Sequence, residues 1–310
     1  MKRIAIVLIS LQICVLSLFA ADAPKQCSLC VGAVADISAP PATPIPLLLQ
    51  LREADLATSG VDAFTPEQRS KLTVTIRYEL ATTDAMSDVE SHTQKIIDWA
   101  RLHGPFEAIG VVPQTSDIAV AGYAIKRLAV TAQGLNVATR IVLPPGLDLD
   151  KLFDTGAFTY IDALLVNAPD VAKTSAWIAQ KDPSKKLWAI VDPQSPNTFF
   201  DLARALADGA TRAYITQATA EDETALANFN QAFIGDWAFD STATTQVLDA
   251  KGNSIIMPVL TFVRGEDLRT IIVPKGDASA AFIASLPSDR FTRPRRVDVA
   301  GDRDVADVGT

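Results

Sequence analysis

The stretch from Lys185 to Ala218 reads KKLWAIVDPQSPNTFFDLARALADGATRAYITQA, and it decides the fold. It opens with an apolar run, Leu187 to Val191, which a turn rich in Pro, Ser and Asn follows. A segment with helical spacing comes next, Thr198 to Asp208, and Gly209 suits its C-terminal end. A second apolar run, Arg212 to Thr216, completes the stretch. A strand, a crossover helix and a second strand form a unit that favours a parallel sheet buried on both faces.

The same pattern extends through most of the chain. Short apolar runs of this kind are typical of parallel strands that are buried on both faces. Eight of them are predicted as strands: Val31 to Ile37, Pro46 to Leu51, Leu72 to Leu80, Ala108 to Val112, Ala138 to Leu143, Ala163 to Val166, Leu187 to Val191, and Arg212 to Thr216.

Helical periodicity separates most of these runs. Ser87 and Glu90 have capping-box spacing, which favours a helix start at Ser87. The connection between the first two strands contains Pro-Pro and a further Pro, and cannot hold a normal helix. Helices are predicted at Thr65 to Leu72, Ser87 to His103, Ile118 to Gln133, Leu149 to Phe153, Val171 to Gln180, Thr198 to Asp208, and Glu221 to Phe233.

Eight strands that alternate with helices predict an α/β fold of the (β/α)8 TIM-barrel type. An open doubly wound sheet is the alternative. Such a sheet normally carries a Gly-rich first turn for a dinucleotide, and neither G-x-G-x-x-G nor G-x-x-x-x-G-K occurs in this sequence. The closed barrel is therefore the preferred interpretation.

The pattern changes after the predicted barrel. Strand-like segments at Thr245 to Asp249 and Ser254 to Val263 flank a turn signal, and Leu268 to Pro274 follows a second turn. This spacing predicts a small antiparallel β-rich segment. The expected organisation is a signal peptide at 1–23, the barrel at 24–240, the β-rich extension at 241–275, and a tail or incomplete β-domain at 276–310.

The first residues have the layout of a secretory signal peptide. Lys2 and Arg3 precede an apolar run, Ile4 to Phe19, and small residues follow. The run is short for a membrane span of about 20 residues, so cleavage is favoured over an uncleaved anchor. We therefore expect a secreted or periplasmic protein with no membrane association beyond this peptide. The formal net charge of −8 also argues against nucleic acid as a partner.

Two cysteines, Cys27 and Cys30, follow the predicted signal peptide. Their Cys-x-x-Cys spacing fits a redox motif, half a zinc site or a local disulfide. The chain has no second pair for a four-cysteine zinc site, and Val31 stands where c-type haem attachment needs His. An oxidising compartment favours a structural disulfide. No metal site and no cofactor are expected.

A secreted barrel followed by a β-rich segment resembles the retaining glycoside hydrolases of clan A. The resemblance rests on the order of elements from Val31 to Pro274 and implies a carbohydrate-active function. Clan members carry a glutamate pair at the ends of strands four and seven. This pair is not found here: the fourth strand continues to Gln114 without Asn-Glu, and Asp192 follows the seventh strand where Glu is expected.

Functional groups of barrel enzymes lie at the C-terminal ends of the strands. The carboxylates there are the catalytic candidates: Asp192 as nucleophile or base, with Glu79 or Glu53 as its partner. The alternative is that Glu53 and Glu79 pair with neighbouring arginines and that Asp192 is a turn or capping residue. Substrate-binding candidates at the same ends are Asp36, Arg52, Arg77, Gln114, Asn167 and Gln217; the resemblance implies that Arg52 orients the nucleophile.

Two functions remain open on this basis. One is a glycoside hydrolase with a non-standard carboxylate pair, acting on a glycan or polysaccharide. The other is a non-catalytic barrel that binds glycan or a cell-envelope partner. His92 and His103 lie eleven residues apart on one predicted helix, too far apart to share a metal, and are interpreted as surface residues. Trp237 is predicted to pack the barrel against the β-rich segment.

Overall fold

The computed structural model describes residues 28–35, 40, 45–80, 85–192, 198–248, 254–272, 283–285 and 297–299. The predicted signal peptide, Cys27 and Asp36 lie outside these residues. The Cys27–Cys30 disulfide and the export of the chain therefore stay predictions. Within the described part of the chain, no helix has the length and apolar character that crossing a membrane requires.

Eight strands form a closed parallel barrel in sequence order, as the sequence predicts. The ring closes where the first strand pairs with the eighth, with Cys30 opposite Arg212 and Ala33 opposite Ile215. The strands are β1 (Cys30–Val34), β2 (Leu47–Arg52), β3 (Leu72–Glu79), β4 (Phe106–Gln114), β5 (Ala138–Leu143), β6 (Ala163–Asn167), β7 (Lys186–Val191) and β8 (Arg212–Ile215).

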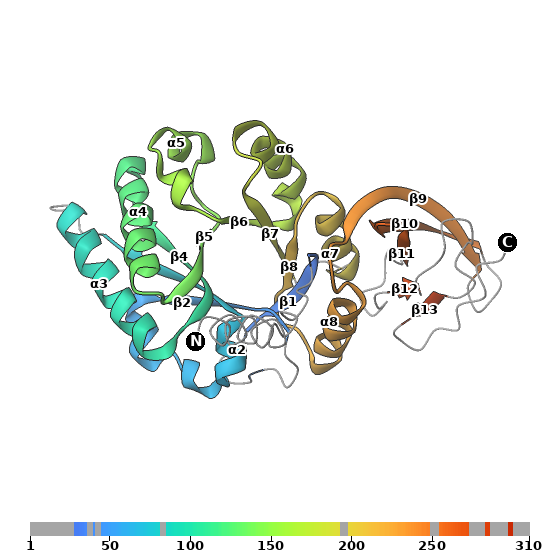
Figure 1. Ribbon diagram of the computed structural model, residues 1–310, viewed down its shortest axis with the longest axis horizontal. Coiled ribbons are helices and arrows are strands. Elements are labelled where there is room, and N and C mark those ends of the chain that lie inside the picture. The colour runs from blue at the N-terminus through green and yellow to red at the C-terminus, as the bar shows by residue number, and fades with distance from the viewer. Residues whose placement is uncertain are drawn as a thin grey trace, which may run out of the picture.

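Helices surround this ring, as Figure 1 shows. Asp117, Asp148 and Thr219 cap three of them by accepting hydrogen bonds from backbone N–H groups of the first turn. The α-helices are α2 (Pro66–Ser70), α3 (Ala85–His103), α4 (Ile118–Gly134), α5 (Leu149–Asp154), α6 (Val171–Lys181), α7 (Thr198–Ala207) and α8 (Ala220–Ala232), and the 3-10 helices are η1 (Glu53–Thr58), η2 (Val61–Ala63), η3 (Ala157–Tyr160) and η4 (Ala168–Asp170).

Alternation along the strands divides the core into two layers. Side chains such as Val74, Ile76 and Tyr78 face outward and pack with the surrounding helices in one large apolar cluster. The intervening positions face the barrel axis, where Leu48, Trp188 and other apolar side chains form a second, smaller cluster. The interior is therefore a packed core, as expected for a barrel of eight strands.

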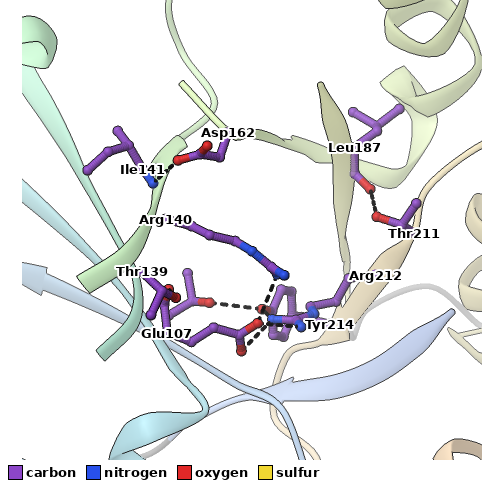
Figure 2. Close-up of polar contacts among 10 residues, drawn as sticks. Glu107, Thr139, Arg140, Ile141, Asp162, Leu187, Thr211, Arg212 and Tyr214 are labelled. Carbon is purple, nitrogen blue, oxygen red and sulfur yellow. Dashed lines mark hydrogen bonds and ion pairs between the residues drawn. The ribbon is translucent and has the colours of Figure 1, made fainter. Parts of the chain in front are cut away.

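An ion cluster lies inside the barrel near the N-terminal ends of the strands (Figure 2). The Arg212 guanidinium donates to both carboxylate oxygens of Glu107, at 2.7 and 2.8 Å, and to the Tyr214 hydroxyl at 3.2 Å. Arg140 Nη1 donates to the same carboxylate at 3.1 Å, and the hydroxyls of Tyr214 and Thr73 are 3.1 Å apart. Glu107 is thus a structural carboxylate at the end of the barrel opposite the expected site.

A five-stranded sheet follows the barrel, in the order β13-β12-β11-β10-β9. Its strands are antiparallel, so the predicted β-rich segment is confirmed. The first strand begins at Ala238, earlier than the predicted Thr245, and two short strands within 276–310 extend the sheet. The strands are β9 (Ala238–Leu248), β10 (Ser254–Arg264), β11 (Asp267–Ile272), β12 (Ile283–Ser285) and β13 (Val297–Val299).

Aromatic packing joins this sheet to the barrel beside α8 (Figure 1). Trp237 is buried, and its ring packs edge-on against Phe233 with centroids 5.5 Å apart. Phe233 also packs edge-on against Phe262 of β10 at 5.2 Å, and Arg264 donates to the Ile234 carbonyl at 2.7 Å. The predicted role of Trp237 at this junction is confirmed.

Candidate functional site

The polar side chains of the site lie where the inward-facing positions of the strands reach the C-terminal rim. The contact between the hydroxyls of Thr73 and Tyr214 inside the barrel shows that Thr73 faces the axis. Alternation along β3 places Arg77 and Glu79 on the same face, above Thr73. In register, Arg77 is opposite Val112 and Glu79 is opposite Gln114, so Gln114 joins them on the inward face. We call this rim the mouth.

The same alternation brings three further side chains to the mouth. Asn167 ends β6 on the face of Ala163 and Leu165, which pack inside the barrel. Asp192 follows β7 on the face of Trp188, and Gln50 lies on the face of Leu48 in β2. Each of the three side chains is exposed. Strands β2, β3, β4, β6 and β7 therefore all contribute polar groups to one end of the barrel.

Arg77 and Glu79 belong to this exposed set. Within the described residues, neither side chain has a hydrogen bond or an ion pair with another protein group. The expectation that Glu79 pairs with a neighbouring arginine is therefore wrong for this part of the chain. A cation and a carboxylate remain available to a ligand at the mouth.

The Glu53 side chain contacts α3. Glu53 begins η1, and its carboxylate contacts His92 Nδ1 and, at 3.2 Å, Lys95 Nζ, both on α3. His92 stacks on Tyr78 with ring centroids 4.5 Å apart. Burial, and then the Glu53 charge, raise the pKa of Tyr78. The structure does not bring Glu53 together with Glu79 and Asp192, and its predicted pairing with arginine is replaced by this cluster.

Two of the predicted binding residues are placed less favourably. Arg52 lies on the inward face of β2 but bends to Asp55 of η1, with Nε donating to Oδ2 at 2.7 Å. Gln217 follows Thr216 and has a positive φ of 53° in the turn after β8. Asp36 lies outside the described residues. The catalytic and binding roles of all these residues stay predictions.

Asp192 is exposed and makes a contact within the protein. This contact leaves both readings of Asp192 open, as a reactive carboxylate and as a turn or capping residue. Gln114 Nε2 has only a long contact, 3.5 Å, with the Val112 carbonyl. Asn167 has no side-chain hydrogen bond within the described residues.

The sequence interpretation missed Gln50. It selected residues at strand ends, whereas Gln50 lies inside β2, between the buried Leu49 and Leu51. The available signal was the alternation itself: a polar residue amid leucines on a strand predicted to be buried on both faces. In the register, Gln50 lies opposite Thr75, which belongs to the inward face of β3.

The two histidines also differ from the prediction. Both lie on α3, yet neither is a free surface residue: His103 Nδ1 is 2.9 Å from Asp62 Oδ1, and His92 contacts Glu53. Each histidine therefore joins α3 to the connection between β2 and β3. The partners come from distant parts of the sequence, so the helical pattern alone could not indicate these pairs.

Two pockets open at this end of the barrel. The mouth pocket, of about 480 Å³, is lined by Arg77, Gln114 and the loop after β5. A second pocket, of about 450 Å³, lies on the other side of that loop, against α6; we call it the distal pocket. The loop residues Pro145, Gly146 and Leu147 line both pockets.

Comparisons with known proteins give a fold-level likeness only. No protein-family model matches the chain, and a search of curated proteins finds no match. The catalytic domain of GH30 xylanase C from Talaromyces cellulolyticus is 12% identical, with a TM-score of 0.46 and coverage of 73% of each chain. A family 18 chitinase from Crocus vernus is 11% identical, with a TM-score of 0.44, over 66% of this chain and 98% of the chitinase. At these values neither likeness bears on function.

Proposed function

We propose that this protein binds a glycan at the mouth of the barrel. The observation that carries the proposal is the set of inward-facing polar side chains there, among them Gln50, Arg77, Glu79 and Asn167, which are exposed and have no protein partner within the described residues. Amide groups both donate and accept hydrogen bonds, as sugar hydroxyls do. Barrel proteins place their functional groups at this end.

We propose further that Glu79 and Asp192 form a non-standard carboxylate pair for hydrolysis. Glu79 ends β3 and Asp192 follows β7, and four steps around a ring of eight strands separate these two strands. The two carboxylates thus approach a ligand from opposite walls. This placement favours the wider separation of inverting enzymes, roughly 6.5 to 9.5 Å, over the retaining separation of about 5 to 5.5 Å. One carboxyl would protonate the leaving oxygen while the other activates water.

The test is an activity and binding screen on a panel of soluble glycans. Glu79→Gln and Asp192→Asn should each lower turnover at least about a hundredfold, the scale of general acid–base catalysis, and keep glycan binding. Arg77→Ala should weaken binding instead. Glu67→Gln is the matched control, because Glu67 is exposed on α2, before the N-terminal end of β3. The activity of Glu67→Gln should equal that of the wild type. In the wild type, the anomeric configuration of the first product should be inverted.

The second candidate is a barrel that binds glycan without hydrolysing it. In this reading Asp192 is a turn or capping residue, a role that its contact within the protein leaves open. If the folded wild-type protein binds a glycan and does not hydrolyse it, this second candidate is established. Full hydrolytic activity in Asp192→Asn would remove Asp192 from the catalytic pair, and the absence of binding to every glycan would overturn the proposal.

We also propose that the protein works after export, on the basis of the N-terminal pattern in 1–23. An oxidising compartment is the setting in which Cys27 and Cys30 would form a disulfide. Mass spectrometry of the exported protein should find a start after this segment and no thiol that reacts before reduction. A retained N-terminus, or two alkylated cysteines without a reductant, would contradict these two expectations.

A further inference from the structure

The distal pocket has two walls built from separate elements. One wall is a single face of α6: Asp170 precedes the helix, and Lys173, Thr174 and Trp177 follow at helical spacing. The other wall is the loop after β5 and the first turn of α5, which Asp148 caps. The distal pocket therefore lies beside the mouth pocket, and the loop at 145–147 lines both.

A hydrogen bond ties the two walls together. Trp177 Nε1 donates to Asp150 Oδ1 at 2.8 Å, from α6 to α5. The Trp177 ring is also held edge-on by Phe153 and Phe158, with centroids 5.9 and 5.1 Å away. The indole is half-buried and keeps part of its surface for the pocket. A ligand would meet an aromatic surface whose orientation is already fixed, which lowers the entropic cost of binding.

Two charged groups at the pocket edge, Asp170 and Lys173, are available to a ligand. Asp170 and Lys173 are both exposed, and neither has an ion-pair partner within the described residues. The hydrogen bond from the Lys151 backbone N–H, which Asp148 caps, lowers the pKa of Asp148. Three carboxylates and one ammonium line the pocket, and Lys151 and Lys181 pair with two of the carboxylates, Asp148 and Asp150. The net charge at the pocket is therefore small, and a neutral polyhydroxy ligand fits.

We propose that the distal pocket is a second binding subsite for a neutral sugar unit, linked to the unit at the mouth. The inference rests on the proposed function and deepens it: the ligand is an oligosaccharide that crosses the loop at 145–147, and a single sugar occupies only part of the site. Asp170 accepts from sugar hydroxyls, Lys173 donates to them, and Trp177 covers a carbon face. Because the two pockets share the loop at 145–147 as a wall, one oligosaccharide can supply the sugar unit in each pocket.

Titration calorimetry with oligosaccharides of increasing length tests this subsite. The probes are neutral xylo-, cello- and chito-oligosaccharides of one to six units, with oligogalacturonides as the anionic series. The wild type should bind the longest member of one neutral series at least about tenfold more tightly than its monosaccharide, a gain that converts to about 1.4 kcal/mol. The anionic series should show no such gain.

The double variant Asp170→Ala/Lys173→Ala should lose this gain and keep the wild-type affinity for the monosaccharide. The matched control is Asp154→Ala/Lys186→Ala, which changes exposed residues of the same types at the end of α5 and the start of β7. The control should retain the gain. Both variants alter exposed side chains, so folding should be unaffected.

The outcomes separate the subsite from the proposed function. The wild type could bind oligosaccharides of all lengths with equal affinity, and Arg77→Ala could weaken that binding. This result would overturn the distal subsite and leave glycan binding at the mouth intact. A length-dependent gain that survives in Asp170→Ala/Lys173→Ala would also overturn it. If no probe binds at any length, both proposals fall together. A preference for the anionic series would contradict the assigned charge of the subsite.

Discussion

Arg212 shows how a single charge is kept inside the barrel. Its side chain is 10% exposed and lies over the Trp188 ring, 4.6 Å from the centroid. Burial alone would lower its pKa, but the interactions with Tyr214 and Glu107 outweigh burial and raise it. Arg212 therefore stays charged. The Glu107 carboxylate that faces it offsets the free-energy cost of burying this charge.

Removing that carboxylate should be strongly destabilising. Glu107→Ala leaves the Arg212 charge buried without its bidentate partner, and breaking a buried pair costs about 3 to 5 kcal/mol. Urea denaturation followed by circular dichroism should show this loss. The proposed glycan binding should be preserved in the folded variant, because the cluster lies at the end of the barrel opposite the mouth.

Arg140→Ala is the control for this prediction. Arg140 contacts the same carboxylate, but its side chain is 39% exposed, so its removal should cost less than about 1 kcal/mol. An equal loss in the two variants, or a loss below about 1 kcal/mol in Glu107→Ala, would contradict the assigned role of the buried pair.

Polar contacts join α3 to several neighbouring elements. His92 and Lys95 bind Glu53 of η1, and His103 binds Asp62 of η2. On another face of α3, Glu90 accepts from the Tyr123 hydroxyl of α4 and from Arg127 Nε at 2.7 Å. The helix thereby holds both the next helix and the connection that follows β2, which begins at the mouth.

The Glu90 contacts give a pH-dependent contribution to stability. The hydrogen bond from Tyr123, and then that from Arg127, lower the pKa of Glu90. A carboxylate with a depressed folded pKa stabilises the fold above its unfolded pKa, about 4.3, and loses this contribution as pH falls through the folded value. Glu90→Gln should therefore lower Tm at pH 7, and the difference from the wild type should shrink as pH falls towards 3.

Thermal melts of the two proteins at a series of pH values measure this difference. The effect should be small, because the Glu90 side chain is 42% exposed and water screens the pair. Asp98→Asn on the same helix is the control, since Gln94 of its own helix is the one partner of Asp98 among the described residues. A Tm difference between wild type and Glu90→Gln that grows on acidification would contradict the expected sign of the pH dependence.

The elements were largely predictable from the sequence, and the partners of their side chains were not. Continuous apolar runs located all eight barrel strands within a few residues, because parallel strands are buried on both faces. β9 begins earlier than predicted, since the polar residues Asp240 to Thr242 conceal its start. Ser87 and Glu90 indicated a capping box, but α3 begins at Ala85 and Glu90 binds α4 instead.

The candidate site was predictable to a similar extent. The rule that barrels carry function at strand ends identified Arg77, Glu79, Gln114 and Asn167, all of which reach the mouth. It failed for Glu53, whose true partners lie on α3. The distal pocket has no sequence signature, because it depends on how α5 and α6 pack across a loop.

At the scale of the whole molecule, a small aromatic junction connects the barrel and the five-stranded sheet. Phe262 of β10 is fully buried and packs against Phe233 at 5.2 Å and Phe239 at 5.7 Å. Phe233 stacks in turn on Phe229 of α8, with centroids 4.3 Å apart. The first strands of the sheet therefore share an apolar core with the last helix of the barrel.

This shared core predicts that the sheet and the barrel unfold together in the wild type. Phe262→Ala removes the ring at the centre of the junction and should cost about 3 to 5 kcal/mol, as deletions of buried phenylalanines do. Because the barrel has its own core, the loss should fall mainly on the sheet. Calorimetry should then show one transition in the wild type and two in Phe262→Ala, with the barrel melting last.

Tyr160→Ala, which removes a partly exposed aromatic ring from η3, should keep the single transition. Two transitions in the wild type, or one unchanged transition in Phe262→Ala, would show that the junction does not couple the parts.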